Sequence, residues 1–538
     1  MEHHTGSEVT TNGEGSGGDA AAAGPQFPLR VIALVEGHGE NVAGTPSGPF
    51  GYVTMIERGE DPNKGLQTLP MMRNSSIAYE VAGESLRRYR ASASAAIVTE
   101  THRLVVPFQV IKENGHTVST VLHSEDDKVA LKLHSGASAE GCGDPAIAPW
   151  ENGRMLMITP CDVGHRRVYE FAEDGGTWTE ALGTLSRVWG NSWKRTGPGV
   201  RGDVITLTIG EKKVMLFAHP LQLGAGTNDV TGSLHLWLTD AKKHIFDVGP
   251  ISEVGEGVGA TSLLYKSEQL SLLYESGENT SRSLVFTSLS AQLARIKEVV
   301  KTWEEVDQRV GKLCPSPSGE KAAAPTRSCD AAVLTEGLVG YWSGNVSGSQ
   351  WQDEYLCVNA AVKDGAKTND NGVAFRGRGA GAQWPVGKQG PNQLYHFANY
   401  NFTLLAVVTI HKVPKGGSGI PLMGVKLNGP ASASLVELLY DESQRWKVVY
   451  KNEAKQTQEK SWEPNTHQYQ VALTLQNGRP PCTLTGSLWL LKVMRFKGTQ
   501  RRKFHISTLG VWEATQKLRK APRREMSRCA TFFCTTVH

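Results

Sequence analysis

The chain has 538 residues, 39% hydrophobic and 20% charged, so it is too long for one small domain and is neither disordered nor collagen-like in composition. Its longest apolar run, residues 404–410, is far shorter than the roughly 20 residues that span a bilayer, so no transmembrane segment is predicted. The net charge of +4 arises from a basic stretch, residues 492–528, but basic and aromatic residues are not interleaved there, and we predict no nucleic-acid partner.

The first 26 residues are rich in Gly, Ala and polar side chains, and they are interpreted as a low-complexity segment without the apolar core of a signal peptide. From residue 104 to residue 288, short apolar runs alternate with turn-forming residues. This spacing is typical of an all-β propeller or barrel. The runs are 104–111, 155–158, 204–209, 214–218, 234–238, 263–264 and 284–286.

The periodicity then changes to steps of three and four, which predicts one amphipathic helix from Ser290 to Leu313. The apolar positions are Leu289, Leu293, Ile296, Val300, Trp303, Val306, Val310 and Leu313. A stretch rich in Pro, Ser and Ala follows and reads as a linker. Beyond Gly337 the strand pattern returns and predicts an antiparallel jelly-roll sandwich of about 140 residues. Its runs are 338–341, 402–410, 422–425, 435–440, 446–450 and 469–475.

None of the eight cysteines forms a C-x-x-C pair or lies near a suitably spaced pair of histidines, so no metal site or cofactor is predicted. Cys314 and Cys329 flank the linker, where a disulfide would close a small loop and suit an oxidising compartment. Secretion is also indicated by four N-x-S/T sequons. The candidate glycosylation sites are Asn74, Asn279, Asn345 and Asn401.

The segment from Cys142-Gly-Asp-Pro to Glu180-Ala-Leu-Gly-Thr-Leu-Ser-Arg-Val-Trp-Gly190 is long and specific. It resembles the trypanosomal trans-sialidase family of the sialidase superfamily. The likeness continues through Leu236-Trp-Leu-Thr-Asp240, Val299-Val-Lys-Thr-Trp303 and Trp384-Pro-Val-Gly, and covers about residues 104–478 with a fainter echo at residues 29–36. The resemblance implies a six-bladed β-propeller joined by a long helix to a concanavalin A-like lectin sandwich, with sialic-acid chemistry in the propeller.

Such propellers carry the Asp box, S-x-D-x-G-x-T-W, which braces a hairpin turn and is structural. Residues 171–178 keep Gly175, Thr177 and Trp178 but have Phe171 at the Ser position. A second eroded copy spans residues 124–131.

The family's sialidases bind the sialate carboxylate with three arginines and attack the anomeric carbon with a Tyr that a Glu polarises, while an Asp is the acid and base. The positions that match these groups are degenerate. Pro149 replaces the Glu, His165 the second Arg, Thr231 the third Arg and Ala260 the Tyr. Arg30 is a candidate for the first Arg, and the Asp positions near the N-terminus have no counterpart.

We therefore expect a catalytically inactive trans-sialidase-like protein that binds sialylated or other host glycans and glycoproteins, as an adhesin or immune decoy, at the cell surface or after secretion. The alternative is an active exo-α-sialidase or trans-sialidase in which Tyr169, Tyr265 or Glu170 replaces a missing group. A third reading is a pseudogene product that folds poorly. The tripeptide Arg201-Gly-Asp203 suits adhesion but also an ordinary turn. The oligomeric state is left open.

From Pro481 the resemblance stops. Permitted codons for Pro481-Cys-Thr-Leu-Thr-Gly486, read two nucleotides on, give the family-like V-Y-I-D-G, and the same offset produces family-like segments from residues 503–510 and 525–538. We interpret residues 481–538 as a basic tail produced by a frameshift near residues 478–480. It would lack strands and a lipid-anchor signal, and would leave the sandwich with unpaired edges.

The predicted organisation has six parts. They are a low-complexity segment (1–26), a sialidase-like propeller (27–287), a linking helix (288–314), a linker (315–334), a lectin-like sandwich (335–480) and the basic tail (481–538).

Overall fold

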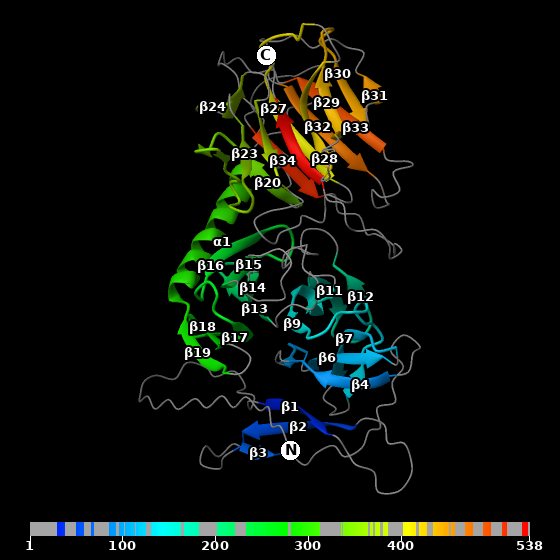
Figure 1. The fold of residues 1–538 in the computed structure, drawn as a ribbon, viewed down its shortest axis with the longest axis vertical. Coiled ribbons are helices and arrows are strands. Elements are labelled where there is room, and N and C mark those ends of the chain that lie inside the picture. The colour runs from blue at the N-terminus through cyan, green and yellow to red at the C-terminus, as the bar shows by residue number, and fades with distance from the viewer. Residues whose placement is uncertain are drawn as a thin grey trace, which may run out of the picture. The chain divides into compact units, whose positions relative to one another are not determined.

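In the residues that the computed structural model describes, the chain is mostly β with one long helix (Figure 1). The described residues are 30–37, 50–58, 66–68, 86–92, 96–101, 103–112, 114–124, 131–162, 166–181, 202–220, 233–277, 281–311, 335, 337–363, 366–369, 372–376, 380–385, 402–415, 419–427, 434–450, 453–457, 469–476, 488–495, 508–513 and 530–535. They fall into two compact units, one within residues 1–145 and 173–177 and the other within 146–172 and 178–538. No helix in these ranges is long and apolar enough to span a membrane.

The first unit contains two antiparallel sheets. One has the order β1-β2-β3, and the other has the order β4-β6-β7-β8 with β5 paired to β6. The strands are β1 Arg30–Gly37, β2 Phe50–Arg58, β3 Leu66–Thr68, β4 Leu86–Ala91, β5 Ile97–Val98, β6 Leu104–Lys112, β7 Thr117–Ser124 and β8 Leu131–Leu133. Alternate apolar residues of β6 and β7 form the core of the second sheet, including Val106, Phe108, Val118 and Leu122.

A buried histidine, His134, directly follows β8 in the first unit. It is 1% exposed, and its Nδ1 accepts the Gly136 N–H at 2.9 Å, which only an unprotonated nitrogen can do. Burial, and then repulsion from His123, lowers the pKa of His134 from 6.5 to about 4. Between these values the unfolded chain binds a proton that the folded chain excludes. The unit is therefore expected to lose up to about 3 kcal/mol of stability as the pH falls from 6.5 to 4.

Chemical denaturation at several pH values across this window tests the expectation. His134→Asn keeps an acceptor close to Nδ1 but does not titrate, so its unfolding free energy should depend less steeply on pH. His116→Asn, at an exposed position of the same sheet, is the matched control and should retain the wild-type slope. Equal slopes in the wild type and His134→Asn would contradict the assignment.

The second unit begins with three antiparallel meanders. The first has the order β12-β11-β10-β9, the second β13-β14-β15-β16 and the third β17-β18-β19, and β13 lies beside both β9 and β17. The strands are β9 Ala146–Pro149, β10 Arg154–Pro160, β11 Arg166–Ala172, β12 Trp178–Glu180, β13 Asp203–Ile209, β14 Lys212–Pro220, β15 Leu234–Thr239, β16 Ile245–Pro250, β17 Val258–Lys266, β18 Gln269–Ser276 and β19 Ser283–Ser288; a short 3₁₀ helix covers Glu151–Gly153. Successive small sheets of this kind are the arrangement expected of propeller blades.

The eroded Asp box connects β11 and β12, and the structure explains its substitution. Phe171, in place of the Ser, is buried and stacks on Trp178 with ring centroids 5.2 Å apart. An aromatic contact thus brackets the turn where the family pattern has a hydrogen-bonding side chain. Gly175 retains the glycine because its φ is +83°, a conformation that other residues rarely adopt.

The predicted helix forms as α1, Ser290–Gly311, and packs against β16 and β18 (Figure 1). One stripe of the helix is buried, as its three-and-four spacing indicates. Its residues are Leu293, Ile296, Val299, Val300, Trp303, Val306 and Val310. The predicted last residue, Leu313, lies outside the described residues.

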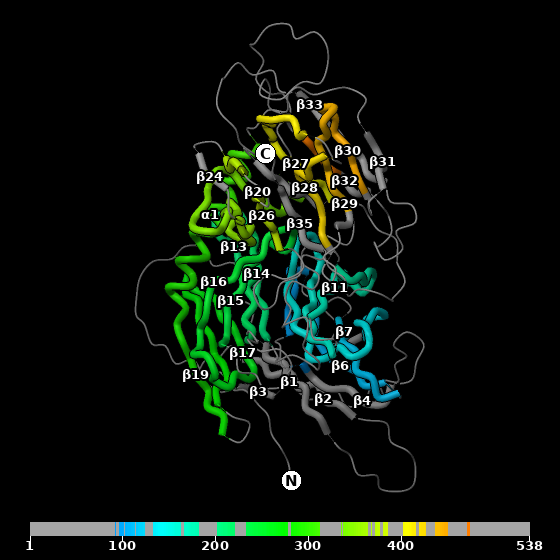
Figure 2. Tube along the Cα trace, turned by 45° about the horizontal axis from the view of Figure 1, so that its top comes forward, coloured from blue at the N-terminus to red at the C-terminus, as the bar shows by residue number. Residues whose placement is uncertain are grey.

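Two sheets form the remainder of the second unit, with the orders β20-β34-β27-β32-β33 and β21-β22-β23-β26-β35-β28-β29-β30-β31, beside a separate hairpin β24-β25 (Figure 2). The strands are β20 Leu338–Trp342, β21 Val346–Ser347, β22 Gln350–Trp351, β23 Ala360–Val362, β24 Ala366–Asn369, β25 Gly372–Phe375, β26 Gly381–Trp384, β27 Phe402–Val408, β28 Ile420–Leu427, β29 Ser434–Tyr440, β30 Trp446–Tyr450, β31 Glu453–Thr457, β32 Tyr469–Gln476, β33 Leu488–Arg495, β34 Thr508–Glu513 and β35 Ala530–Thr535. Both sheets contribute to one core, with Trp342 and Leu404 from the first and Trp384 and Trp446 from the second, so they pack as a sandwich.

The expectation that the tail lacks strands is wrong. Three strands lie within residues 481–538, and two of them are interior. β34 pairs with β20 and β27, and β35 pairs with β26 and β28. The predicted unpaired edges are therefore filled at these places. A segment such as Thr-Leu-Gly-Val-Trp-Glu is rich enough in β-forming residues to occupy a sheet position whatever frame encodes it. The frameshift itself stays a prediction.

Candidate functional site

Two of the positions that the resemblance assigns to catalysis lie on the end strands of two meanders of the second unit. Pro149 is the last residue of β9, and Ala260 lies in β17; both are half-buried. Ala260 presents a methyl group, and its backbone N–H donates to Glu275 Oε2 at 3.2 Å. His165 and Thr231 lie outside the described residues, and Arg30 is described only as backbone of β1 in the first unit.

An ion pair covers the backbone beside Ala260. Arg282 Nη1 lies 2.5 Å from Glu275 Oε2, and a Cβ added to Gly259 would overlap atoms of both side chains. Glycine at position 259 is thus what allows the pair to lie across β17. Glu275 and Arg282 were not predicted from the sequence, because their contact depends on how β18 and β19 pair with β17.

Asp203, the last residue of the Arg-Gly-Asp tripeptide, is the first residue of β13 and is engaged by neighbouring backbone. Its carboxylate accepts the N–H groups of Leu263 at 2.8 Å and Val204 at 2.9 Å, and its own N–H donates to Thr261 Oγ1. Burial raises the pKa of this carboxyl to about 6. Asp203 therefore braces β13 against β17 and is not presented to a partner, in keeping with the turn interpretation.

A buried arginine lies directly after the His165 position. Arg166 begins β11, is 1% exposed, and lies over the Phe217 ring with its guanidinium carbon 5.3 Å from the ring centroid. The His219 ring packs against the Phe217 ring and stacks on the Trp237 ring, with the His219 and Trp237 ring centroids 5.5 Å apart. Arg167 points elsewhere, to Glu180 at 3.4 Å. The guanidinium next to the His165 position is thus held on the Phe217 ring.

The tyrosines near the expected site are engaged in other contacts. Tyr169 is 4% exposed and packs against Trp178. Tyr265 donates its hydroxyl to Glu268 at 2.9 Å, and it lies five residues beyond Ala260 in β17, about 16 Å along an extended strand. Glu170 is paired with Arg154 at 2.7 Å. Ala260 lies near the start of β17 and Tyr265 near its end.

One tyrosine and glutamate pair was not anticipated. Tyr274 in β18 donates its hydroxyl to Glu256 Oε1 at 3.3 Å. Burial, together with the neighbouring carboxylate, raises the pKa of Tyr274, so the phenolate that attack requires is disfavoured. Its ring belongs to the hydrophobic core that also contains α1, and we assign the pair a structural role.

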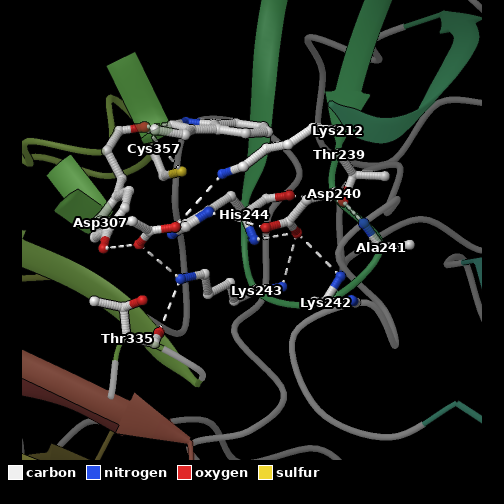
Figure 3. A network of polar contacts seen from close by, with 12 residues as sticks. Lys212, Thr239, Asp240, Ala241, Lys242, Lys243, His244, Asp307, Thr335 and Cys357 are labelled. Atoms are coloured by element: carbon white, nitrogen blue, oxygen red, sulfur yellow. Dashed lines mark hydrogen bonds and ion pairs between the residues drawn. The ribbon is translucent and has the colours of Figure 1, made fainter. Parts of the chain in front are cut away.

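A dense polar cluster lies where α1, the second meander and the base of the sandwich meet (Figure 3). Asp240 Oδ1 accepts the backbone N–H groups of residues 242, 243 and 244, while Oδ2 accepts Nδ1–H of His244 at 3.0 Å. His244 is fully buried and stacks on Tyr355 with ring centroids 4.0 Å apart. Burial lowers the pKa of His244, so its ring is neutral and donates to the ionised Asp240.

Asp307 of α1 completes the cluster. It accepts the Tyr355 hydroxyl at 2.6 Å and pairs with Lys243 at 3.1 Å and Lys212 at 3.4 Å (Figure 3). Lys243 also donates to the Thr335 carbonyl at 2.8 Å. These contacts bind three parts of the second unit together. In the described ranges no three His, Cys, Asp or Glu side chains are arranged to hold a metal ion.

The cysteines differ from expectation. Cys142 and Cys161 are disulfide-bonded, although sequence analysis named neither, and Cys357 is a free thiol. Cys314 and Cys329 lie outside the described residues. Of the four sequons, only Asn345 falls within the described ranges, and it is exposed between β20 and β21.

Two family models match the chain. The trans-sialidase C-terminal domain matches residues 334–510, and a BNR repeat-like domain matches residues 30–275. The first match extends 30 residues or so beyond the point at which sequence analysis ended the resemblance, which agrees with the strands found in that stretch.

Meanders followed by a sandwich define the sialidase class of fold. Trypanosoma rangeli sialidase in complex with sialic acid superposes with a TM-score of 0.72 at 33% identity, over 94% of this chain and 79% of that one. A Trypanosoma cruzi sialidase is 35% identical over 76% of this chain, and the T. cruzi sialidase 85-1.1 is 32% identical over 78%. The chain belongs to the trypanosomal trans-sialidase family. It spans 34% and 53% of the lengths of these two T. cruzi relatives.

Proposed function

We propose that this protein is a non-catalytic member of the family that binds sialylated or other host glycans and glycoproteins. The observation that carries the proposal is the alanine at position 260 of β17, where the resemblance places the nucleophile. A methyl group cannot form a glycosyl-enzyme bond, and Pro149 has no carboxylate with which to polarise a nucleophile. Loss of both groups removes the covalent step rather than slowing it.

The support for glycan binding is the relationship itself, because T. rangeli sialidase has been solved with sialic acid bound. We extend the proposal to a six-bladed propeller whose first carboxylate-binding group is Arg30, and to a lectin-like role for the sandwich. Delivery to the cell surface or secretion, glycosylation at Asn345 and a Cys314–Cys329 disulfide belong to the same proposal.

The full chain should release no fluorophore from a fluorogenic sialoside above a protein-free blank, while binding sialylated members of a glycan array. A folded sample is verified by the near-ultraviolet signal of its buried tryptophans. Tyr265→Phe and Tyr169→Phe are the control variants for a displaced nucleophile. Turnover that one of these variants abolishes would establish the alternative, an exo-α-sialidase or trans-sialidase.

The frameshift near residues 478–480 predicts that independent copies of the gene carry family-like codons in a second frame after this point. Sequencing the locus from several isolates tests it. A continuous single frame in all of them would overturn the interpretation.

A further inference from the structure

A hollow of about 360 Å³ lies on the second unit between α1 and two hairpin turns. Tyr265 and Glu268 reach it from the β17–β18 turn, and Lys297, Lys301 and Glu304 reach it from the helix. Val300 and Ile209 add apolar surface to its lining. Neither Pro149 nor Ala260, the two degenerate catalytic positions that the structure describes, lines the hollow.

Three of its side chains hold one another in place. Glu268 accepts the Tyr265 hydroxyl at 2.9 Å through Oε1 and the Lys297 ammonium at 2.8 Å through Oε2. Ser267 and Glu268 have φ values of 51° and 59°, so the turn places two non-glycine residues in the left-handed region. The Tyr265 ring is thereby fixed from one end while remaining partly exposed.

Glu304 supplies a carboxylate that is not so engaged. It is partly buried, lines the hollow, and has no hydrogen-bond or ion-pair partner among the described side chains. Lys301 has a distant partner, Glu305 at 3.8 Å, and can turn toward the hollow. Two carboxylates and two lysine ammonium groups line the hollow, so their charges balance. This balance favours a neutral polar ligand over an anion.

We propose that this hollow binds a neutral pyranose, the kind of ring found in the uncharged part of a glycan. Its apolar C–H face would pack on the Tyr265 ring, and its hydroxyls would donate to Glu304 and accept from Lys301. A volume of about 360 Å³ is at the small end of ligand sites and suits one or two sugar rings. The proposal uses none of the residues on which the proposed function depends, and it stands if sialoside binding fails.

Saturation-transfer NMR on the full chain, with lactose as the neutral probe and free sialic acid as the anionic one, tests the proposal. Lactose should receive saturation, and its affinity should fall about tenfold or more in Tyr265→Ala and in Glu304→Ala. Tyr265→Phe keeps the ring and should bind lactose within about threefold of the wild type. Sialic acid should not compete with lactose.

Glu305→Ala, at the next and exposed position of α1, is the matched control and should leave lactose binding unchanged. Thermal denaturation of each variant separates loss of binding from loss of fold. Absence of saturation transfer to lactose in the wild type, or lactose binding that survives both Tyr265→Ala and Glu304→Ala in folded protein, would overturn the proposal.

Discussion

Trp303→Ala is expected to lower the free energy of unfolding of the second unit by about 3–5 kcal/mol. Trp303 is fully buried, is the largest side chain in the stripe of α1, and belongs to a core that also contains residues of β17, β18 and β20. Its indole N–H donates to the Tyr355 carbonyl at 2.8 Å. Truncation therefore leaves a cavity and also an acceptor without its donor.

Two variants separate these contributions. Trp303→Phe retains most of the apolar volume but loses the donor, and it should cost about 1–3 kcal/mol. Phe286→Ala removes an aromatic ring that is 68% exposed and should change stability by about 0.5 kcal/mol or less. Urea denaturation followed by tryptophan fluorescence and by far-ultraviolet circular dichroism measures all three. A cost for Trp303→Ala no larger than that for Phe286→Ala would show that α1 does not stabilise the unit.

Asp240→Ala is expected to lower the free energy of unfolding of the second unit by a similar amount, about 3–5 kcal/mol. Although burial raises the pKa of Asp240, its contacts with His244 and with backbone N–H groups outweigh that effect and hold the pKa below its ordinary value. The carboxylate satisfies three backbone donors and one imidazole, and all of these except the N–H of Lys242 belong to buried residues. Alanine leaves these donors without an acceptor in a place that water does not easily reach.

The second histidine and aspartate pair of this meander provides the control. Asp247 and His235 are 2.9 Å apart, but the Asp247 side chain is 35% exposed. Asp247→Ala should therefore cost about 1 kcal/mol or less, because water replaces the lost partner. Asp240→Asn, which keeps an oxygen for the backbone donors, should fall between the two alanine variants. Equal costs at positions 240 and 247, measured by urea denaturation, would contradict the assigned burial.

The elements that sequence analysis predicted well are those whose signals are local. The stripe of α1 follows from residues three or four apart, and runs such as residues 204–209 contain in themselves the alternation that a strand requires. The positions Pro149 and Ala260 were assigned from the motifs that flank them closely, and that assignment stays a prediction. The Asp240 cluster was not found, because it joins Asp307 to Lys212 and Tyr355, residues 95 and 48 positions away in the chain.

The tail also shows that local sequence signals do not suffice to predict every strand. Its composition is basic and no family motif was identified in it from the sequence, so no strand was predicted there. Strand formation also depends on what a segment can pair with, and β20, β27, β26 and β28 offer open edges on both sides of the places that β34 and β35 fill. An open edge of this kind is a property of the sheet, and it cannot be predicted from the sequence of the segment that fills it.

The positions of β34 and β35 also set the order in which the sandwich can be completed during synthesis. β20 and β27 are made about 100 residues or more before β34, and β26 and β28 about as long before β35. At ribosomal rates of about 5–20 residues per second, four strands wait several seconds with an unpaired edge after leaving the ribosome. Both sheets close with their latest strands, so folding of the sandwich is governed by long-range contacts and is slow. During that interval the nascent chain is a substrate for chaperones and proteases.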